Sequence, residues 1–97
     1  MEFEWDPHKA DRNLRKHKVS FEEAATVFGD PLSMTVPDPD HSWEEDRYLT
    51  VGMSDYGRLL IVAHTEEAGG ERIRIISARP LTRREREAYE QGEFDRG

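Results

Sequence analysis

The spacing of the apolar residues changes near Pro31, and this change restricts the fold more than any other feature of the chain. Before Pro31, apolar side chains recur every three or four residues, which is the spacing of one face of a helix. After it, they alternate with polar ones over several short stretches, as on half-buried strands. Helices followed by a run of strands indicate an α+β fold, with helices packed on a small antiparallel sheet. At 97 residues, the chain is expected to form one domain over residues 1–97.

Two helices are predicted before Pro31, after a short strand over residues 1–5. Asp6 and Pro7 are typical of a helix start, because aspartate caps free N–H groups and proline fits the first turn. The apolar face of this first helix is predicted to hold Ala10, Leu14 and His17.

The second helix is predicted to begin at Ser20, three residues before Glu23, which is the spacing of a capping box. Gly29 is expected to end it, and Asp30-Pro31 blocks its continuation. Its apolar stripe contains Phe21, Ala24, Ala25 and Phe28.

Four strands and a last helix are predicted after Pro31. A polar loop over 37–46 follows the first of these strands, and the later connections are short, which favours hairpin pairing. The last helix is predicted from Thr82 to about Gln91, because Thr82 and Glu85 form a second capping box and Gly92 follows. The strands are expected over residues 32–36, 47–54, 58–65 and 72–79.

The sequence lacks the residues that several protein classes require. It has no cysteine, so it forms neither disulfides nor thiolate metal sites. No H-E-x-x-H spacing, glycine-rich phosphate loop or nucleophile elbow occurs, so neither a metal nor a cofactor is expected. The N-terminus is unlike a signal peptide, and the longest apolar run, Leu59–Ala63, is too short to cross a bilayer. We therefore expect a soluble cytoplasmic protein without membrane contact.

Charge is sorted along the chain. The formal net charge is −7, which by itself argues against a nucleic-acid partner. Residues 8–18 nevertheless carry five Lys or Arg against one Asp, and residues 72–86 carry six Arg against one Glu. The segments 38–46 and 87–97 hold much of the acid. Such a chain can form a basic face on an acidic protein, and the alternative is two solvated helix faces and a polar loop.

Four groups of residues occur in an order that covers nearly the whole chain. They are Phe3-Glu4-Trp5-Asp6-Pro7 with Lys9-Ala10, Asn13-Leu14 and Lys16-His17; Val19 to Ala24 with Val27 to Pro31; Glu45-Asp46-Arg47 with Gly52, Ser54 and Gly57-Arg58; and Arg74 to Arg79 with Arg84-Glu85-Arg86 and Tyr89. No single group is specific, but the ordered set resembles the BrnT family of toxins from toxin–antitoxin systems.

The resemblance implies a fold similar to RelE-type ribonucleases, with a small curved sheet flanked by helices. It implies RNA cleavage that blocks translation. It also implies neutralisation by a small BrnA-like antitoxin in a heterotetramer, with operator DNA bound through the antitoxin. Lys18 departs from the family pattern, which often has a glycine after the histidine that ends the first helix.

Cleavage of RNA without a metal uses the 2′-hydroxyl of the substrate as the nucleophile. The protein helps to remove its proton, stabilises the charged phosphorane and assists the leaving oxygen, and fixed cations usually supply the largest share. Arginine suits this task because its planar guanidinium binds two phosphate oxygens at once. Arg79 is the first candidate, because it ends a strand just before a helix N-terminus, where a phosphate is also favoured. Its alternative role is an ion pair with Glu85 or with the acidic loop.

Four further residues are catalytic candidates, each with a structural alternative. His17 suits general acid–base work, and is otherwise a hydrogen-bonded histidine near a helix C-terminus. Tyr89 either contacts RNA or packs the last helix on the sheet. Arg47 lies either in a cleft or with its head in solvent. Glu45 shares a face with Arg47 on an extended chain, either as a base or as an ion-pair partner.

Five basic residues are candidates for binding RNA, with solvated faces as the alternative. Arg72 and Arg74 lie on the opposite side of their strand from Ile73 and Ile75, where they would form a phosphate track. The full set is Lys9, Arg72, Arg74, Arg83 and Arg86. Among the other histidines, His64 is expected at the edge of the core, and His8 and His41 in exposed positions.

The alternative function is a non-catalytic binding module that grips an antitoxin or another DNA-binding partner as a co-repressor. The acidic loop and tail suit a basic partner. A third possibility is a ribonuclease-like scaffold without activity. The ribonuclease prediction requires arginines from distant stretches of the chain to converge in one groove.

Overall fold

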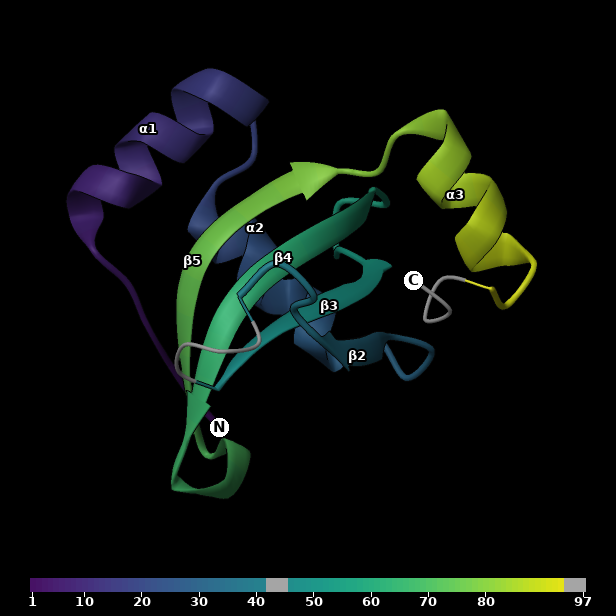
Figure 1. The fold of residues 1–97 in the computed structure, drawn as a ribbon. Coiled ribbons are helices and arrows are strands. Elements are labelled where there is room, and N and C mark those ends of the chain that lie inside the picture. Colours follow the sequence, from purple (N-terminus) through teal and green to yellow (C-terminus); the bar gives the residue numbers. More distant parts are fainter. Residues whose placement is uncertain (42–45, 94–97) are drawn as a thin grey trace.

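A curved, mixed sheet forms the centre of the protein, with helices around it (Figure 1). The computed structural model describes residues 1–41 and 46–93, and in these the strand order is β1-β5-β4-β3-β2. The predicted α+β class is confirmed, and the ends of the predicted strands lie within about two residues of the observed ones. The strands are β1 (Glu2–Glu4), β2 (Met34–Pro37), β3 (Arg47–Met53), β4 (Leu59–Glu67) and β5 (Arg72–Pro80); the helices are α1 (Pro7–His17), α2 (Phe21–Thr26) and α3 (Arg83–Glu90), with 3-10 turns η1 (Val27–Gly29) and η2 (Ala68–Gly70).

The prediction of a wholly antiparallel sheet is wrong, because β1 pairs with β5 in parallel. The register joins Glu2 to Arg72 and Glu4 to Arg74, while the other neighbouring strands are antiparallel. The two paired strands are separated by most of the chain, so the rule that consecutive strands form hairpins says nothing about them. A three-residue strand also has too little alternation to indicate its partner.

The predicted helix starts are found at Asp6, Ser20 and Thr82. Each of these side chains accepts a hydrogen bond from the backbone N–H of the first turn. The capping box at Thr82 is complete, because the Glu85 carboxylate accepts the Thr82 N–H in return. The one at Ser20 is only half formed, since the Glu23 carboxylate contacts Ser54 and Arg58 instead.

The buried residue of α1 is Asn13, and not the predicted apolar face. Leu14 is 47% exposed, whereas Asn13 is 7% exposed. α1 lies along the edge of β5 and contributes one polar anchor to the fold in place of a broad apolar stripe (Figure 1). The expected glycine cap at Gly29 is also wrong, because Gly29 belongs to η1 and has no positive φ.

The main core lies between α2 and one face of the sheet. Phe21, Ala24 and Val27 are completely buried there. They pack against residues of β4 and β5, namely Leu60, Val62, Ile73, Ile75 and Ala78. A smaller cluster on the opposite face contains Val51, Ile61 and Leu81, and Tyr89 of α3 packs on it.

A β-bulge in β5 reverses which residues face the core. Ala63 pairs with Ser77, but the next residue, His64, pairs with Ile75, so Ile76 is the additional residue. Simple alternation from Ile73 and Ile75 would send Ser77 and Arg79 toward the core. Because of the bulge, both face the opposite side of the sheet, together with Arg74.

Candidate functional site

The sheet face opposite the main core carries three rows of paired residues between α1 and α3. The rows run across three strands and are about 7 Å apart along the strand direction. The middle row contains the small side chains of Ala63 and Ser77, which leave space between the arginines of the outer rows. The rows are Arg47, Thr65 and Arg74; Leu49, Ala63 and Ser77; and Val51, Ile61 and Arg79.

Three adjoining hollows form one groove over this face, with volumes of about 320, 230 and 350 Å³. The first two share Ser77, the second and third share Arg47, and the third and first share Lys9. We call this continuous surface the basic groove. Its cationic side chains are Lys9, Arg12, Lys16, Arg47, Arg74 and Arg79, against the acidic Asp38, Asp40 and Glu67.

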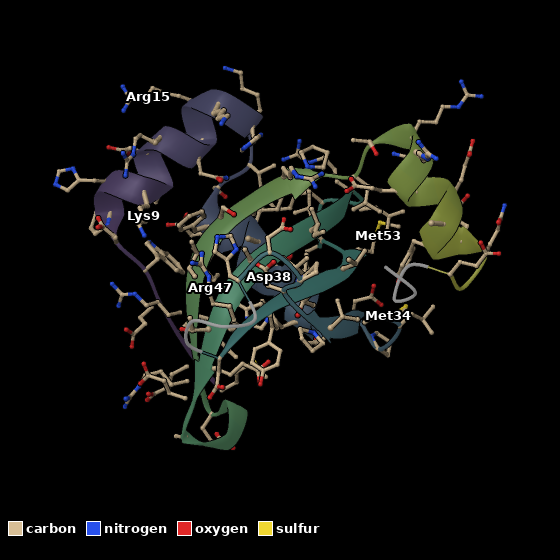
Figure 2. The ribbon with its side chains drawn as sticks, in the orientation of Figure 1. Lys9, Arg15, Met34, Asp38, Arg47 and Met53 are labelled. Carbon is tan, nitrogen blue, oxygen red and sulfur yellow. The ribbon has the colours of Figure 1, made fainter. Side chains whose placement is uncertain are left out.

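The groove is built from elements that are far apart in the sequence. Figure 2 shows Lys9 on α1 and Arg47 on β3 on the same open side of the sheet, with Asp38 near Arg47. Lys9 and Arg47 line the same hollow, and Arg47 and Arg79 line the next one. The required convergence of distant cations is therefore present for these three residues, although the whole chain is acidic.

Arg79 is held by Glu85 in a two-point ion pair. Its two terminal nitrogens donate to the two carboxylate oxygens of Glu85 at 2.7 and 2.9 Å. Arg79 lowers the pKa of Glu85 to about 2, and Glu85 raises the pKa of Arg79. Both partners are partly exposed, at 39% for Arg79 and 28% for Glu85. The ion pair fixes the guanidinium in the groove, and it also sets a carboxylate in competition with any bound phosphate.

His17 lines the first hollow and Arg79 lines the second, and Ser77 borders both hollows. The pKa of His17 is lowered from its ordinary value of 6.5, first by burial and then by the positive charges of Lys16 and Arg79. The lowered pKa favours the neutral imidazole, which is the form that can accept a proton. Two of the predicted catalytic residues, from α1 and β5, therefore line adjoining parts of the basic groove.

The other predicted catalytic residues are placed differently. Arg47 lines two of the three hollows. Glu45 lies outside the described residues. Tyr89 packs on the cluster of Val51, Ile61 and Leu81, and its hydroxyl donates to the Leu32 carbonyl at 2.9 Å. Burial and the nearby Asp30 raise the pKa of Tyr89. These contacts match the packing alternative for Tyr89, away from the groove lining.

Two of the five predicted RNA-binding residues, Lys9 and Arg74, line the groove. Arg74 also pairs with Glu4 at 2.7 Å. Arg72, Arg83 and Arg86 are not among the residues that line the three hollows. Arg72 lies near several glutamates of the neighbouring strands, and Arg83 pairs with Glu87 along α3.

Several groove residues were not singled out in the sequence. Arg12 and Lys16 follow Lys9 at intervals of three and four residues, so helical spacing places them on one face. The adjacent pair Ile75-Ile76 breaks strict alternation and signals the bulge that turns Ser77 into the groove. His41 lines the second hollow, where its Nδ1 lies 3.1 Å from the Asp38 carboxylate.

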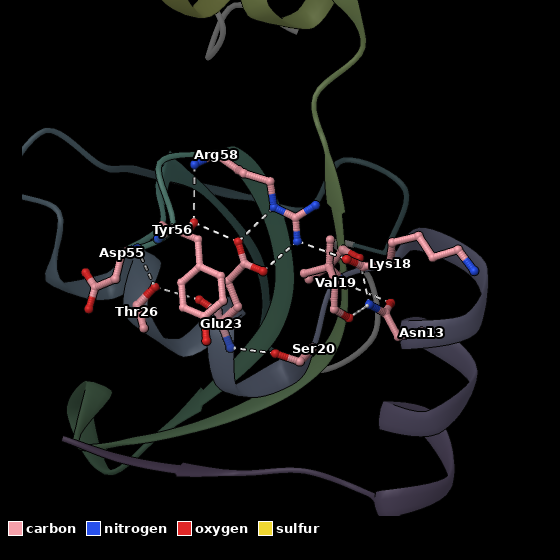
Figure 3. A network of polar contacts seen from close by, with 11 residues as sticks. Asn13, Lys18, Val19, Ser20, Glu23, Thr26, Asp55, Tyr56 and Arg58 are labelled. Carbon is pink, nitrogen blue, oxygen red and sulfur yellow. Dashed lines mark hydrogen bonds and ion pairs between the residues drawn. The ribbon is translucent and has the colours of Figure 1, made fainter.

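A second polar cluster lies away from the groove, around the buried Glu23 (Figure 3). Its carboxylate accepts hydrogen bonds from the Arg58 guanidinium and from the Ser54 hydroxyl, and both lower its pKa. Arg58 donates further to the Lys18 carbonyl at 2.9 Å. The cluster joins α2, the β3–β4 hairpin and the end of α1, so its role is to hold these elements together.

Among residues 1–41 and 46–93, no group of three or more histidine, aspartate or glutamate side chains is arranged to hold a metal ion. In the same part of the chain, no helix has the length and apolar character needed to cross a membrane.

The fold and the groove define a small α+β protein with a cationic surface suited to a polyanionic ligand. Residues 5–85 match the family described as ribonuclease toxin, BrnT, of type II toxin–antitoxin systems, and the chain belongs to this family. Membership implies an antitoxin partner. The fold is similar to the crystal structure of the Brucella abortus ribonuclease toxin BrnT, with a TM-score of 0.64 and 20% identity, over 86% of this chain and 99% of that one. No curated protein matched the sequence. The likeness to RelE-type ribonucleases stays a prediction.

Proposed function

We propose that this ribonuclease toxin is a metal-independent endoribonuclease that cleaves RNA in the basic groove and thereby blocks translation in the cytoplasm. The observation that carries the proposal is the presence of His17, Arg79, Lys9 and Arg47 along the adjoining hollows of one groove. The cations suit the phosphates on both sides of a scissile bond. The neutral imidazole suits proton transfer near pH 7.

In the proposed reaction, His17 removes the proton of a ribose 2′-hydroxyl. The 2′-oxygen then forms a bond to phosphorus, and the bond from phosphorus to the 5′-oxygen of the next nucleotide breaks. The leaving 5′-oxygen takes up a proton from water, and the imidazolium of His17 returns its proton to the solvent, so the products carry a 2′,3′-cyclic phosphate and a 5′-hydroxyl. Arg79 and Arg47 stabilise the extra negative charge of the phosphorane, because their charge is fixed in place before the reaction begins.

The antitoxin is proposed to be BrnA-like and to form a heterotetramer that reaches operator DNA through the antitoxin. The acidic net charge of the toxin favours a basic partner surface.

The test is cleavage of a labelled single-stranded RNA by the purified protein, with and without EDTA. Cleavage is expected to survive EDTA and to leave cyclic phosphate ends. Replacing the proton acceptor in His17→Ala is expected to slow cleavage by about 10²-fold or more. His8→Ala is the matched control, because His8 lies on the same helix but is exposed and does not line the groove. Loss of cleavage in EDTA, or equal rates for both variants, would contradict the mechanism.

One observation favours the alternative of a non-catalytic binding module. Arg72, Arg74, Arg79 and Arg83 all have glutamate partners, which reduces their attraction for phosphate. Under this alternative the protein would leave RNA intact at high concentration and would still bind its antitoxin.

A further inference from the structure

Two elements lie along the outer edge of β5, first β1 and then α1. β1 pairs only with Arg72 to Arg74, and beyond this point α1 lies beside the strand (Figure 1). A strand edge left without a neighbour would have unpaired N–H and C=O groups. At Ala78 these groups are both satisfied by one side chain of α1, that of Asn13.

The amide of Asn13 pairs with Ala78 as a neighbouring strand would. Its Nδ2 donates to the Ala78 carbonyl at 2.8 Å, and its Oδ1 accepts the Ala78 N–H at 3.0 Å. The second Nδ2 proton is donated to the Val19 carbonyl at 2.9 Å, just beyond the end of α1 (Figure 3). Asn13 is only 7% exposed, so these three hydrogen bonds are shielded from water.

The residues on either side of this contact are the groove residues. Asn13 is four residues from Lys9 and four from His17, so all three lie on one face of α1. Ala78 lies directly between Ser77 and Arg79. One buried amide therefore joins the helix that carries His17 to the strand segment that carries Arg79.

We propose that Asn13 is a positioning residue that fixes the place of His17 relative to Arg79 across the groove. The proposal rests on the proposed function, in which these two side chains act on the same phosphate. α1 makes few other buried contacts, because Leu14 is exposed and Ala10 only partly buried. Without the amide, the helix can shift along β5, and the distance between imidazole and guanidinium is no longer fixed.

Asparagine is the side chain that this position requires. Alanine would leave the Ala78 N–H and two carbonyls without partners. Aspartate would keep an acceptor for the Ala78 N–H but would present a negative charge to the Ala78 and Val19 carbonyls. Asn13→Ala and Asn13→Asp therefore both release α1, and the second retains part of the contact.

The test combines an NMR titration of His17 with cleavage kinetics on single-stranded RNA, both on the full chain. In both variants the pKa of His17 is expected to rise toward 6.5, because burial and the proximity of Arg79 decrease together. The kcat for cleavage is expected to fall about ten- to hundredfold, with a smaller change in KM. Ser54→Ala is the matched control, because it also removes a buried hydrogen bond, in the cluster around Glu23, and should change neither quantity.

Each outcome is decisive. An unchanged pKa of His17 in the folded variants would overturn the positioning role, as would the failure of both variants to fold. A raised pKa with an unchanged kcat would support the positioning role and instead contradict the catalytic role of His17 in the proposed function.

Discussion

Two ion pairs between arginine and glutamate hold different parts of the sheet, and they differ in the burial of the glutamate, since both arginines are 39% exposed. Glu23 is 3% exposed and accepts two hydrogen bonds from Arg58. Glu85 is 28% exposed and accepts two from Arg79. A buried carboxylate that loses its partner cannot be compensated by water, whereas a partly exposed one can. The pairing at Glu23 therefore stabilises the fold, whereas the pairing at Glu85 holds the Arg79 guanidinium in the groove, where a bound phosphate would compete with the carboxylate.

The two pairs also differ in what they connect. Glu23 and Arg58 are 35 residues apart, and the pair joins α2 to the β3–β4 hairpin. Glu85 and Arg79 are six residues apart, and the pair joins the end of β5 to the capping box of α3. The first pair therefore depends on the tertiary fold, and the second largely on local structure.

The largest effect is expected from breaking the buried pair. Arg58→Ala would leave the buried Glu23 carboxylate with the Ser54 hydroxyl alone, and should lower the free energy of unfolding by about 3 kcal/mol, the lower end for a buried pair because Arg58 itself is 39% exposed. Urea denaturation followed by circular dichroism measures this change. Cleavage per folded molecule should stay the same, since Arg58 does not line the basic groove. A loss below about 1 kcal/mol would remove the distinction between the two pairs.

Breaking the Arg79–Glu85 pair should have the opposite effects, with a large loss of cleavage and a small loss of stability. Arg79→Ala is expected to lower kcat for RNA cleavage about 10²–10³-fold, because a fixed cation beside the phosphorane is lost. The free energy of unfolding should change by less than about 1 kcal/mol, as for other exposed pairs. Arg83→Ala is the control, since Arg83 pairs with Glu87 on the same helix but lies outside the groove. Equal kcat values for the two variants would contradict the assignment of Arg79.

Local features of the molecule could be predicted from the sequence, and those that depend on distant contacts could not. The capping box at Thr82 was predicted because both partners lie within four residues. The box at Ser20 was only half right, because Glu23 is drawn to Arg58 by tertiary contacts. For the groove, residue types indicated Arg79 and His17. The adjacent pair Ile75-Ile76 signals the bulge that turns Arg79 into the groove. The anchor of α1 at Asn13 depends on its contact with Ala78, which spacing alone does not reveal.

The core side of the sheet should also be the more sensitive to acid. His64 is completely buried, and burial lowers its pKa from 6.5 to about 4. Between these values the unfolded chain binds a proton that the folded protein does not. The free energy of unfolding should therefore fall as the pH drops from 6.5 to 4, by about 3 kcal/mol in total.

Urea denaturation at several pH values measures this contribution. His64→Gln keeps a polar group for the hydrogen bond to Thr50 but has no titrating proton, so its stability should change less over the same range. Identical pH dependence in both proteins would assign the acid sensitivity to the carboxylates instead.

Neutralising the Glu85 carboxylate tests directly whether it competes with phosphate for Arg79. Glu85→Gln preserves the capping interaction but removes the negative charge beside Arg79. RNA affinity should rise several-fold, and the slope of log K against log salt should become steeper by about 0.7, as for one more phosphate contact on a single strand. Fluorescence anisotropy in a His17→Ala background, where cleavage is blocked, measures both. Weaker binding would mean that Glu85 orients Arg79 for phosphate.

The smallest effect is expected at Lys18, where the end of α1 contacts the Glu23–Arg58 pair. Lys18 has a left-handed backbone, with φ 60° and ψ 32°, which glycine adopts without steric cost. Its exposed side chain does not line the groove, and its carbonyl accepts the bond from Arg58 whatever the side chain. Lys18→Gly should therefore raise the free energy of unfolding by about 0.5–1 kcal/mol without changing cleavage. Ala68→Gly, at the other positive φ outside glycine among the described residues, should raise it similarly. If only Ala68→Gly raised the free energy of unfolding, the Lys18 side chain would be shown to stabilise the end of α1 and, with it, the Glu23–Arg58 pair.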